Sequence, residues 1–311
     1  MEQEKINEIL EQIKNMQPHA KGNGRICYKV GNYAVLLENE NAFKANEQVK
    51  ANTDKCIEAG ITTPAILYNG IHDGKCVMVQ EFVEGKQLYS RSAGRLCIQQ
   101  GEPEPEYISV LQKNVKAEYD NKNNITFADV LDYTPEQKKQ YKEAVQKYTD
   151  ERFATDTELQ KKVDYSNEME QLWREDCEQS AREIANTAQE HFDKFLKDIG
   201  EMQKIGLGID GKPDNFIRCP SKGFVWIDLS CGTPRPSPTA SAAQSLKLLC
   251  DVLTRGCLNV KNSEQLQKAI ADKCLQSAKN LGIPYDVAMS SLPDYLEALI
   301  APPQSSGKEG K

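Results

Sequence analysis

The feature that most constrains this chain is the run Asp-Gly-Lys-Pro-Asp-Asn-Phe at residues 210–216, followed about a dozen residues later by Ile-Asp-Leu-Ser at 227–230. Apolar residues at 216–217 and 224–227 flank a Pro-Ser-Lys-Gly turn at 220–223, which is the pattern of a short β-hairpin. Because a hairpin returns the chain to its starting point, the polar residues at its two ends are expected to gather at one site.

The polar residues in question are Asp210, Lys212, Asn215 and Asp228. The pattern D-x-K-P-x-N, with a hairpin and a second aspartate behind it, resembles the catalytic and metal-binding segment of the protein kinase superfamily. The resemblance implies that Asp210 takes the proton of an acceptor hydroxyl and that Lys212 neutralises the transferred phosphate. It also implies that Asn215 and Asp228 bind Mg²⁺ or Mn²⁺. A surface turn is the alternative interpretation, since Asp-Gly-Lys-Pro-Asp-Asn is also good turn chemistry.

Some positions depart from the kinase pattern. Gly208 stands where kinases usually have histidine, and Leu229-Ser230 replaces the Phe-Gly that usually follows the second aspartate. The largest departure is Leu36, which occupies the position of the third-strand lysine that holds the α- and β-phosphates of ATP. The chain is therefore either an inactive pseudokinase or a kinase in which another cation reaches the phosphates.

The N-terminal third is predicted to form a small lobe that begins with a glycine loop. Gly22 and Gly24 precede an apolar run at 25–30, and a Gly-Asn turn joins this run to a second one at 33–37. A two-residue Gly-Asn turn favours a β-hairpin. The glycines ahead of it would either let backbone N–H groups approach phosphates or simply form a turn.

This hairpin predicts where a replacement cation would stand. With the Gly-Asn dipeptide as the turn, Lys29 pairs with Ala34 and Cys27 pairs with Leu36. Arg25, Cys27 and Lys29 alternate onto one face, so Arg25 or Lys29 would point where a lysine at position 36 would have pointed. For Lys29 a solvated surface lysine is the alternative.

A helix is predicted over residues 42–59, which are rich in helix formers and end at Gly60. Glu47 on this helix is the candidate ion-pair partner of the phosphate-binding cation. Glu38 and Glu40 are competing candidates for that partner.

The apolar run at 75–82 resembles the buried strand that enters a kinase hinge. In kinases the hinge backbone pairs with adenine, so Glu81 and Val83 are the candidate adenine contacts, and an ordinary core strand followed by a turn is the alternative. The full set of candidate ATP-binding residues is Gly22, Gly24, Arg25, Cys27, Lys29, Ala34, Glu47, Glu81 and Val83.

Composition argues against several other classes of protein. The chain has 311 residues, a formal net charge of −7 and no basic run, so a nucleic-acid partner is not expected. No apolar stretch approaches the roughly 20 residues that span a bilayer, and the charged residues 1–14 are predicted to form a helix, not a secretion signal. The 10 cysteines include no C-x-x-C pair, which favours a reducing, cytoplasmic setting.

We predict an α+β, protein-kinase-like bilobal fold, with a small β-rich N-lobe at 1–85 and a mostly helical C-lobe at 86–311. The C-lobe is expected to carry a large helical insertion at about 95–180, the catalytic loop and metal-binding hairpin at 200–232, and a disordered tail at 305–311.

Helices are expected through most of the C-lobe. Thr134 and Pro135 indicate a helix start inside the insertion, and residues 137–170 are expected to be helical. A proline-rich segment at 231–238 is followed by helical segments at 242–253, 263–281 and 285–300, with Pro293 breaking the last. One further helix before the catalytic loop is predicted from apolar residues on a single face, namely Ile184, Ala188, Phe192, Phe195, Ile199 and Met202.

The function implied by the resemblance is an atypical ATP-dependent kinase that transfers the γ-phosphate to a hydroxyl. A protein Ser or Thr is the favoured acceptor, because Lys212 falls two residues after Asp210. One alternative is a small-molecule phosphotransferase similar to aminoglycoside or choline kinases, which have similarly reduced C-terminal helices. Another is a pseudokinase that binds a partner, or an activator, through the helical insertion. A bacterial effector delivered to a host cytosol is a further hypothesis.

Overall fold

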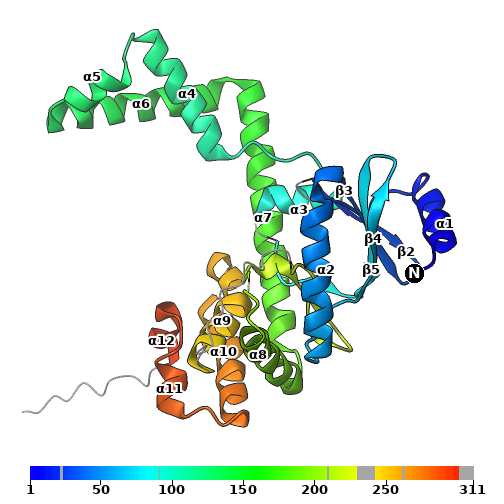
Figure 1. The fold of residues 1–311 in the computed structure, drawn as a ribbon. Helices are drawn as coiled ribbons and strands as arrows, with labels where there is room; N and C mark the ends of the chain where they lie inside the picture. Colours follow the sequence, from blue (N-terminus) through cyan, green and yellow to red (C-terminus); the bar gives the residue numbers. More distant parts are fainter. Residues whose placement is uncertain (22–23, 91, 209, 230–241, 261–262, 301–311) are drawn as a thin grey trace, which may run out of the picture. The chain divides into compact units, whose positions relative to one another are not determined.

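The fold is α+β, as predicted, in a computed structural model that describes residues 1–21, 24–90, 92–208, 210–229, 242–260 and 263–300. The chain divides into two units, one made of residues 1–91 with 174–311 and the other of residues 92–173 (Figure 1). Gly22, the proline-rich segment at 231–238 and the tail at 305–311 lie outside the described residues. Within the described ranges, no helix is both long enough and apolar enough to cross a membrane.

A five-stranded antiparallel sheet forms the N-terminal part of the first unit, in the order β1-β2-β3-β5-β4. The Gly-Asn turn joins β2 to β3, so that Lys29 pairs with Ala34 and Cys27 pairs with Leu36. The predicted register is therefore confirmed, since a two-residue connection fixes how its strands pair. The strands are β1 (Ala20–Lys21), β2 (Ile26–Val30), β3 (Tyr33–Asn39), β4 (Ile66–His72) and β5 (Lys75–Glu81).

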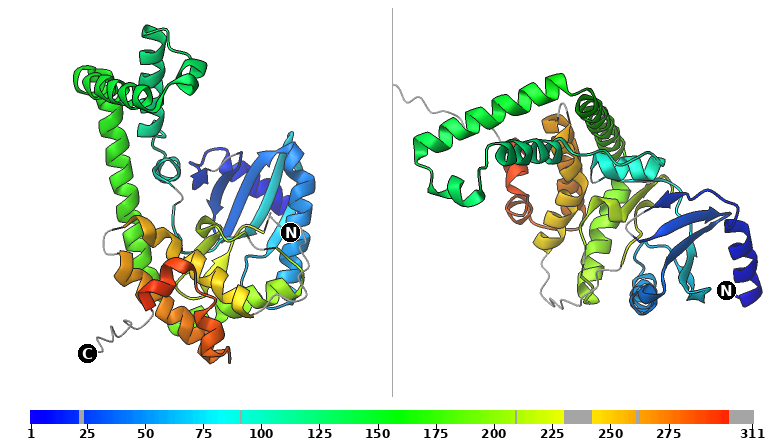
Figure 2. Two further views of the ribbon diagram at one scale, coloured as in Figure 1. Left: turned by 90° about the vertical axis from the view of Figure 1, so that its left-hand side faces the viewer. Right: turned by 90° about the horizontal axis from the view of Figure 1, so that it is seen from above.

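Helices cover the two faces of this sheet (Figure 2). On one face, the buried isoleucines of α1 (Gln3–Ile13) pack against Val35 and Val79. A 3-10 turn at Glu40–Ala42 leads into α2 (Phe43–Glu58), which covers the other face. Because side chains alternate along a strand, α2 meets the face of β3 that carries Glu38.

The remainder of the first unit holds a three-stranded sheet in the order β6-β7-β8 and the helices around it. The predicted hairpin is confirmed, with Phe216 of β7 paired to Trp226 of β8. Phe195 of α8 packs against Phe216 and Phe224, so α8 supports the hairpin. These strands are β6 (Lys86–Gln87), β7 (Phe216–Cys219) and β8 (Gly223–Trp226), and α8 is Gln189–Lys204.

Beyond the hairpin the first unit is helical. Helix α10 contacts both α8 and α9 (Figure 1). The predicted break at Pro293 is confirmed, because it lies between α11 and α12. The helices are α9 (Ala242–Thr254), α10 (Ser263–Asn280), α11 (Tyr285–Met289) and α12 (Asp294–Ile300), with a 3-10 turn at Arg255–Asn259.

The second unit is helical throughout. Thr134 and Gln137 form a capping box at the start of α6, with Pro135 as its first residue, as the sequence predicts. The helices are α3 (Ala93–Gln100), α4 (Ile108–Lys122), α5 (Phe127–Asp132), α6 (Pro135–Thr155) and the first part of α7 (Thr157–Ala185).

The helical stretch expected at 137–170 is interrupted at Asp156. The backbone of this residue is extended, and its carboxylate accepts the N–H groups of Glu158 and Leu159 to start α7. An aspartate that caps a new helix in this way favours a break over a continuous helix.

The prediction of a single helix from Ile184 to Met202 is wrong, because α7 ends at Ala185 and α8 begins at Gln189. Between them, the Thr187 hydroxyl donates a hydrogen bond to the Glu183 carbonyl. Short polar side chains compete in this way with helical hydrogen bonding, and Asn186 and Thr187 stand together at the break.

Candidate active site

The carboxylate of Asp210 and the ammonium of Lys212 form an ion pair, with 2.5 Å between Oδ2 and Nζ. The Asp210 side chain is 17% exposed and the Lys212 side chain is 44% exposed. The backbone carbonyl of Asp210 accepts a hydrogen bond from the Asn215 amide at 3.2 Å. The structure thus brings Asp210, Lys212 and Asn215 into direct contact.

The loop that carries these residues is packed closely against α9. A Cβ at Gly211 would lie 2.7 Å from Cδ1 of Leu248, so only a residue without a side chain fits there unless Leu248 moves. On the other side, the N–H of buried Leu207 donates back to the carbonyl of Met202 in α8. The loop therefore contacts α8 where it begins and α9 at Gly211.

Asn215 and Asp228 lie at the open end of the β7–β8 hairpin. The N–H of Ile227 donates to the carbonyl of Asn215 at 2.9 Å, which continues the pairing of the two strands. The Trp226 indole donates to the backbone carbonyl of Asp228 at 3.0 Å and fixes the chain there. The hairpin therefore returns Asp228 to the side of Asn215.

The side chains at this end have the chemistry that a hard divalent cation requires, because carboxylate and amide oxygens are the ligands that Mg²⁺ and Mn²⁺ prefer. The Asn215 amide nitrogen bonds to the Asp210 carbonyl, which sets the direction of its amide oxygen. Among the described residues, no three His, Cys, Asp or Glu side chains converge as a metal-binding group. An ion held by Asn215 and Asp228 would therefore need further oxygen atoms, such as those of a nucleotide.

Arg25 forms an ion pair with Glu38, with 3.1 Å between Nε and Oε1. The other oxygen of Glu38 accepts a hydrogen bond from Asn46 of α2 at 2.7 Å. Asn46 is only 2% exposed. Sequence reasoning missed this residue, although its position in the buried stripe with Val49 and Thr53 is a signal that would have found it.

The prediction that Glu47 pairs with the replacement cation is wrong. Glu47 is exposed on α2, and the observed partner of Arg25 is Glu38, one of the competing candidates. Successive residues of a helix are rotated by about 100°, so Asn46 facing the sheet turns Glu47 toward solvent.

Lys29 is directed elsewhere, toward the chain that leaves β5. Its ammonium lies 2.5 Å from the carboxylate of Glu84 and 4.3 Å from the centre of the Phe82 ring. Val83 is buried against Val225 of the hairpin, and the Glu81 carboxylate accepts the N–H of Ala65. Lys29 thus contacts the residues on either side of Val83, whereas Arg25 is linked through Glu38 to α2.

The remaining candidate nucleotide contacts lie on or beside the β2–β3 hairpin. Gly24 lies two residues before the start of β2, and Ala34 is buried on β3. Burial raises the pKa of the Cys27 thiol to about 11, so this side chain is neutral and behaves as a small apolar group. Cys27, Ala34 and Leu36 form a mainly apolar surface between the two cations.

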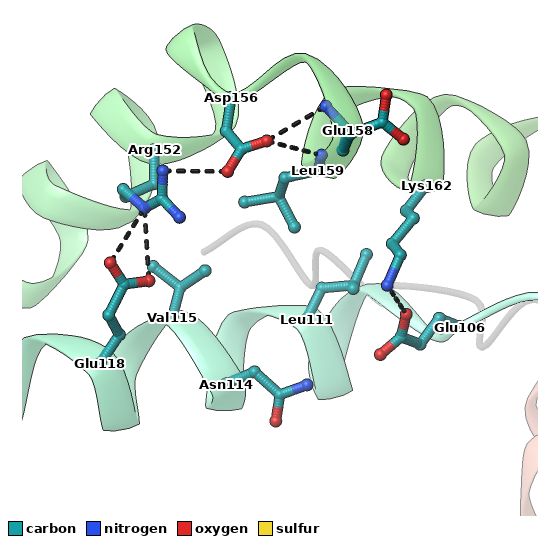
Figure 3. A pocket seen from close by; sticks show the side chains of 10 residues that line it. All are labelled: Glu106, Leu111, Asn114, Val115, Glu118, Arg152, Asp156, Glu158, Leu159 and Lys162. Carbon is teal, nitrogen blue, oxygen red and sulfur yellow. Dashed lines mark hydrogen bonds and ion pairs between the residues drawn. The ribbon is translucent and has the colours of Figure 1, made fainter.

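A separate cavity of about 270 Å³ lies in the second unit, between α4, α6 and α7 (Figure 3). Leu111, Val115 and Leu159 supply its apolar lining. Most of the charged side chains around it are paired with one another, Arg152 with Glu118 and Asp156, and Lys162 with Glu106. None of the predicted site residues lines this cavity.

Comparison with known proteins finds similarity among solved structures. No family model matches the chain, and no curated protein matches it. Similar solved structures include aminoglycoside phosphotransferase APH(3'')-Id from Streptomyces rimosus, at 13% identity and a TM-score of 0.38, covering 96% of this chain and 99% of that one. The same enzyme in complex with ADP and streptomycin gives 12% identity and a TM-score of 0.37, covering 97% and 100%.

Proposed function

We propose that this chain is an atypical ATP-dependent kinase that transfers the γ-phosphate to a hydroxyl group. The observation that carries the proposal is the contact among Asp210, Lys212 and Asn215, beside a hairpin that returns Asp228 to the same end. Two carboxylates, an amide and a lysine in this arrangement are the groups that metal-dependent phosphoryl transfer uses.

Each of these residues then has a role. Asp210 would orient the acceptor hydroxyl and take its proton. Lys212 would turn from Asp210 toward the transferred phosphate and neutralise its charge. Asn215 and Asp228 would bind Mg²⁺ or Mn²⁺, which when bound screens the charge of the phosphates.

We propose that Arg25 binds the α- and β-phosphates, in place of the third-strand lysine whose position Leu36 occupies. Arg25 follows Gly24 directly. Its ion pair with Glu38 orients it, and Asn46 donates a hydrogen bond to Glu38. Lys29 is less suited because Glu84 and Phe82 draw its ammonium away.

The rest of the nucleotide would lie along the same face of the sheet. Backbone groups of Glu81 and Val83 would bind adenine, Cys27 and Ala34 would contact the base or sugar, and the loop with Gly22 and Gly24 would cover the phosphates.

The acceptor is proposed to be a protein Ser or Thr, on the basis of Lys212 two residues after Asp210. A small-molecule hydroxyl fits the same chemistry equally well. Leu36 instead favours a pseudokinase, in which the helical insertion would bind a partner or an activator. The setting proposed is a cytosol, either of the producing cell or of a host.

One assay separates these functions. The chain is incubated with γ-labelled ATP and Mg²⁺ or Mn²⁺, in parallel with generic protein acceptors and with aminoglycosides or choline. Transfer that is lost in both Asp210→Ala and Asp228→Ala supports the kinase, and the labelled acceptor identifies the substrate class. No transfer to any acceptor, with nucleotide binding intact, would favour the pseudokinase.

A further inference from the structure

Two ion pairs join α7 to the strands beside the candidate metal site. The Lys86 ammonium of β6 lies 2.7 Å from the carboxylate of Asp176, and the Arg218 guanidinium of β7 pairs with Glu183. Lys86 and Arg218 are direct cross-strand partners, so their side chains project from one face of the sheet. Asp176 and Glu183 project from one side of α7, since positions about seven residues apart return to the same side of a helix. We refer to these residues as the α7 ion-pair cluster.

The cluster is partly shielded from water. The Asp176 side chain is 17% exposed and that of Arg218 is 24% exposed. Burial alone would raise the pKa of Glu183, but hydrogen bonds from Gln179 and Arg218 and the charge of Lys86 together lower it below its ordinary value. Glu183 is therefore charged at neutral pH, and each cation of the cluster faces a carboxylate.

The strands held by the cluster are in close contact with the candidate metal site. A Cβ at Gly85 would lie 2.2 Å from the Arg218 carbonyl oxygen, so the chain entering β6 passes directly against β7. The N–H of Leu88 donates to the Phe216 carbonyl at 3.1 Å, and the Gln87 amide donates to the Asp214 carbonyl at 2.9 Å. The carbonyl groups that accept these two hydrogen bonds belong to the residues on either side of Asn215 in the chain. One bond comes from β6 and the other from the residue that follows it.

We propose that Asp176 and Glu183 are positioning residues for the candidate metal site. By fixing Lys86 and Arg218 they fix the β6–β7 pair, and through it the backbone of Asn215 and, across the hairpin, that of Asp228. This inference rests on the proposed function and deepens it, because it assigns the geometry of the metal site to a helix outside the catalytic loop. Ion pairs at a protein surface usually contribute little to stability, so their effect is expected in the site more than in the melting temperature.

The test compares Glu183→Gln with a matched control on the same helix. Glu178→Gln removes the same charge from a carboxylate that pairs with Arg182 within α7. A charge-swapped double variant, Glu183→Arg with Arg218→Glu, restores an ion pair with opposite polarity. Melting temperatures confirm that each variant is folded. Two readouts are then measured, the Mg²⁺-dependent affinity for ADP and the amide hydrogen exchange of Leu88 and Ile227.

We expect Glu183→Gln to weaken Mg²⁺-dependent ADP binding by about tenfold and to accelerate exchange at both amides by a similar factor. Glu178→Gln should change neither readout, and the double variant should recover most of both. The positioning role would be overturned if the two amides exchanged at the same rate in Glu183→Gln as in Glu178→Gln. It would also be overturned if they exchanged faster in Glu183→Gln while its Mg²⁺-dependent affinity for ADP stayed unchanged. If the unmodified chain does not bind ADP with Mg²⁺, the proposed function fails, and the exchange comparison alone decides whether α7 positions the hairpin.

Discussion

Lys212 Nζ lies 2.5 Å from Oδ2 of Asp210, so the proposed base is in direct contact with the lysine that is proposed to neutralise the transferred phosphate. A carboxylate paired with a lysine is a weak proton acceptor, because the neighbouring positive charge stabilises its ionised form. Arrival of a negatively charged phosphate would draw the ammonium away and leave the carboxylate to the acceptor hydroxyl. In the proposed mechanism, the pair would therefore link nucleotide binding to activation of the base.

Replacing Lys212 by alanine should reduce phosphoryl transfer by about 100-fold while leaving the affinity for Mg·ADP within about threefold, because the lost charge acts on the moving phosphate. Single-turnover transfer and calorimetry measure the two quantities. Lys204→Ala is the control, since Lys204 pairs only locally with Glu201 at the end of α8 in the described structure. Equal transfer rates in the two variants would remove Lys212 from the mechanism.

Replacing Arg25 by glutamine should raise the KM for ATP by about tenfold, because a charge-assisted contact to phosphate is lost. Lys29→Gln should raise it by less than about threefold, since the Lys29 ammonium is engaged by Glu84. Glu38→Gln should fall between the two. Steady-state kinetics at fixed Mg²⁺ give the comparison, and a larger effect for Lys29 than for Arg25 would reverse the assignment of the cation.

Gly211→Ala should destabilise the chain by about 1–3 kcal/mol and slow transfer, because the new Cβ would lie 2.7 Å from Leu248 and displace the loop. Gly200→Ala serves as the control, since a Cβ there meets only Ser245 Oγ at 3.9 Å. The second substitution Leu248→Ala, combined with Gly211→Ala, should restore the transfer rate by making room. Chemical denaturation and the transfer assay test this, and a double variant as slow as Gly211→Ala would show that the contact is unimportant.

Stability should fall in alkaline solution. Burial raises the pKa of the Cys27 thiol from its ordinary value of 9.0 to about 11, and does the same for Cys257. Burial also raises the pKa of Tyr295 from 10.0 to about 12. These groups lose their protons in the unfolded chain first, so the stability they contribute is complete below about pH 9 and is lost as the pH rises toward the folded-state values.

Each fully titrating group should lower the free energy of unfolding by about 1.4 kcal/mol per pH unit within that window. Denaturant unfolding at a series of pH values between about 8 and 11 measures the slope. Cys257→Ala removes one such group and should make the slope shallower. A free energy that stays constant up to about pH 11 would contradict the burial of these thiols.

The sequence predicted those parts of the structure that short-range rules determine. The Gly-Asn turn fixed the pairing of Lys29 with Ala34, and the Pro-Ser-Lys-Gly turn fixed the hairpin that returns Asp228 to Asn215. Whether Glu38 or Glu47 pairs with Arg25 depended on which side of α2 faces the sheet, and helix propensity does not determine that side. That choice was settled by the burial of Asn46.

Other features depended on contacts that are distant in sequence. The ion pairs of Asp176 and Glu183 join residues far apart along the chain, and no local pattern marks them. The break between α7 and α8 was hidden because Ile184 and Phe192 keep a helical spacing across it. Side-chain pairing between Asp210 and Lys212 also could not be predicted, because a motif places residues in sequence and does not set their rotamers.

Calorimetric titration of ADP with and without Mg²⁺ tests most directly whether Asn215 and Asp228 share one metal–nucleotide site. We expect the unmodified chain and Asp286→Ala, an exposed control on α11, to bind ADP much more tightly when Mg²⁺ is present. Asp228→Ala and Asn215→Ala should lose this dependence on Mg²⁺. Binding that is equal with and without Mg²⁺ in the unmodified chain, or a dependence on Mg²⁺ that is unchanged in Asp228→Ala, would show that these residues do not form such a site.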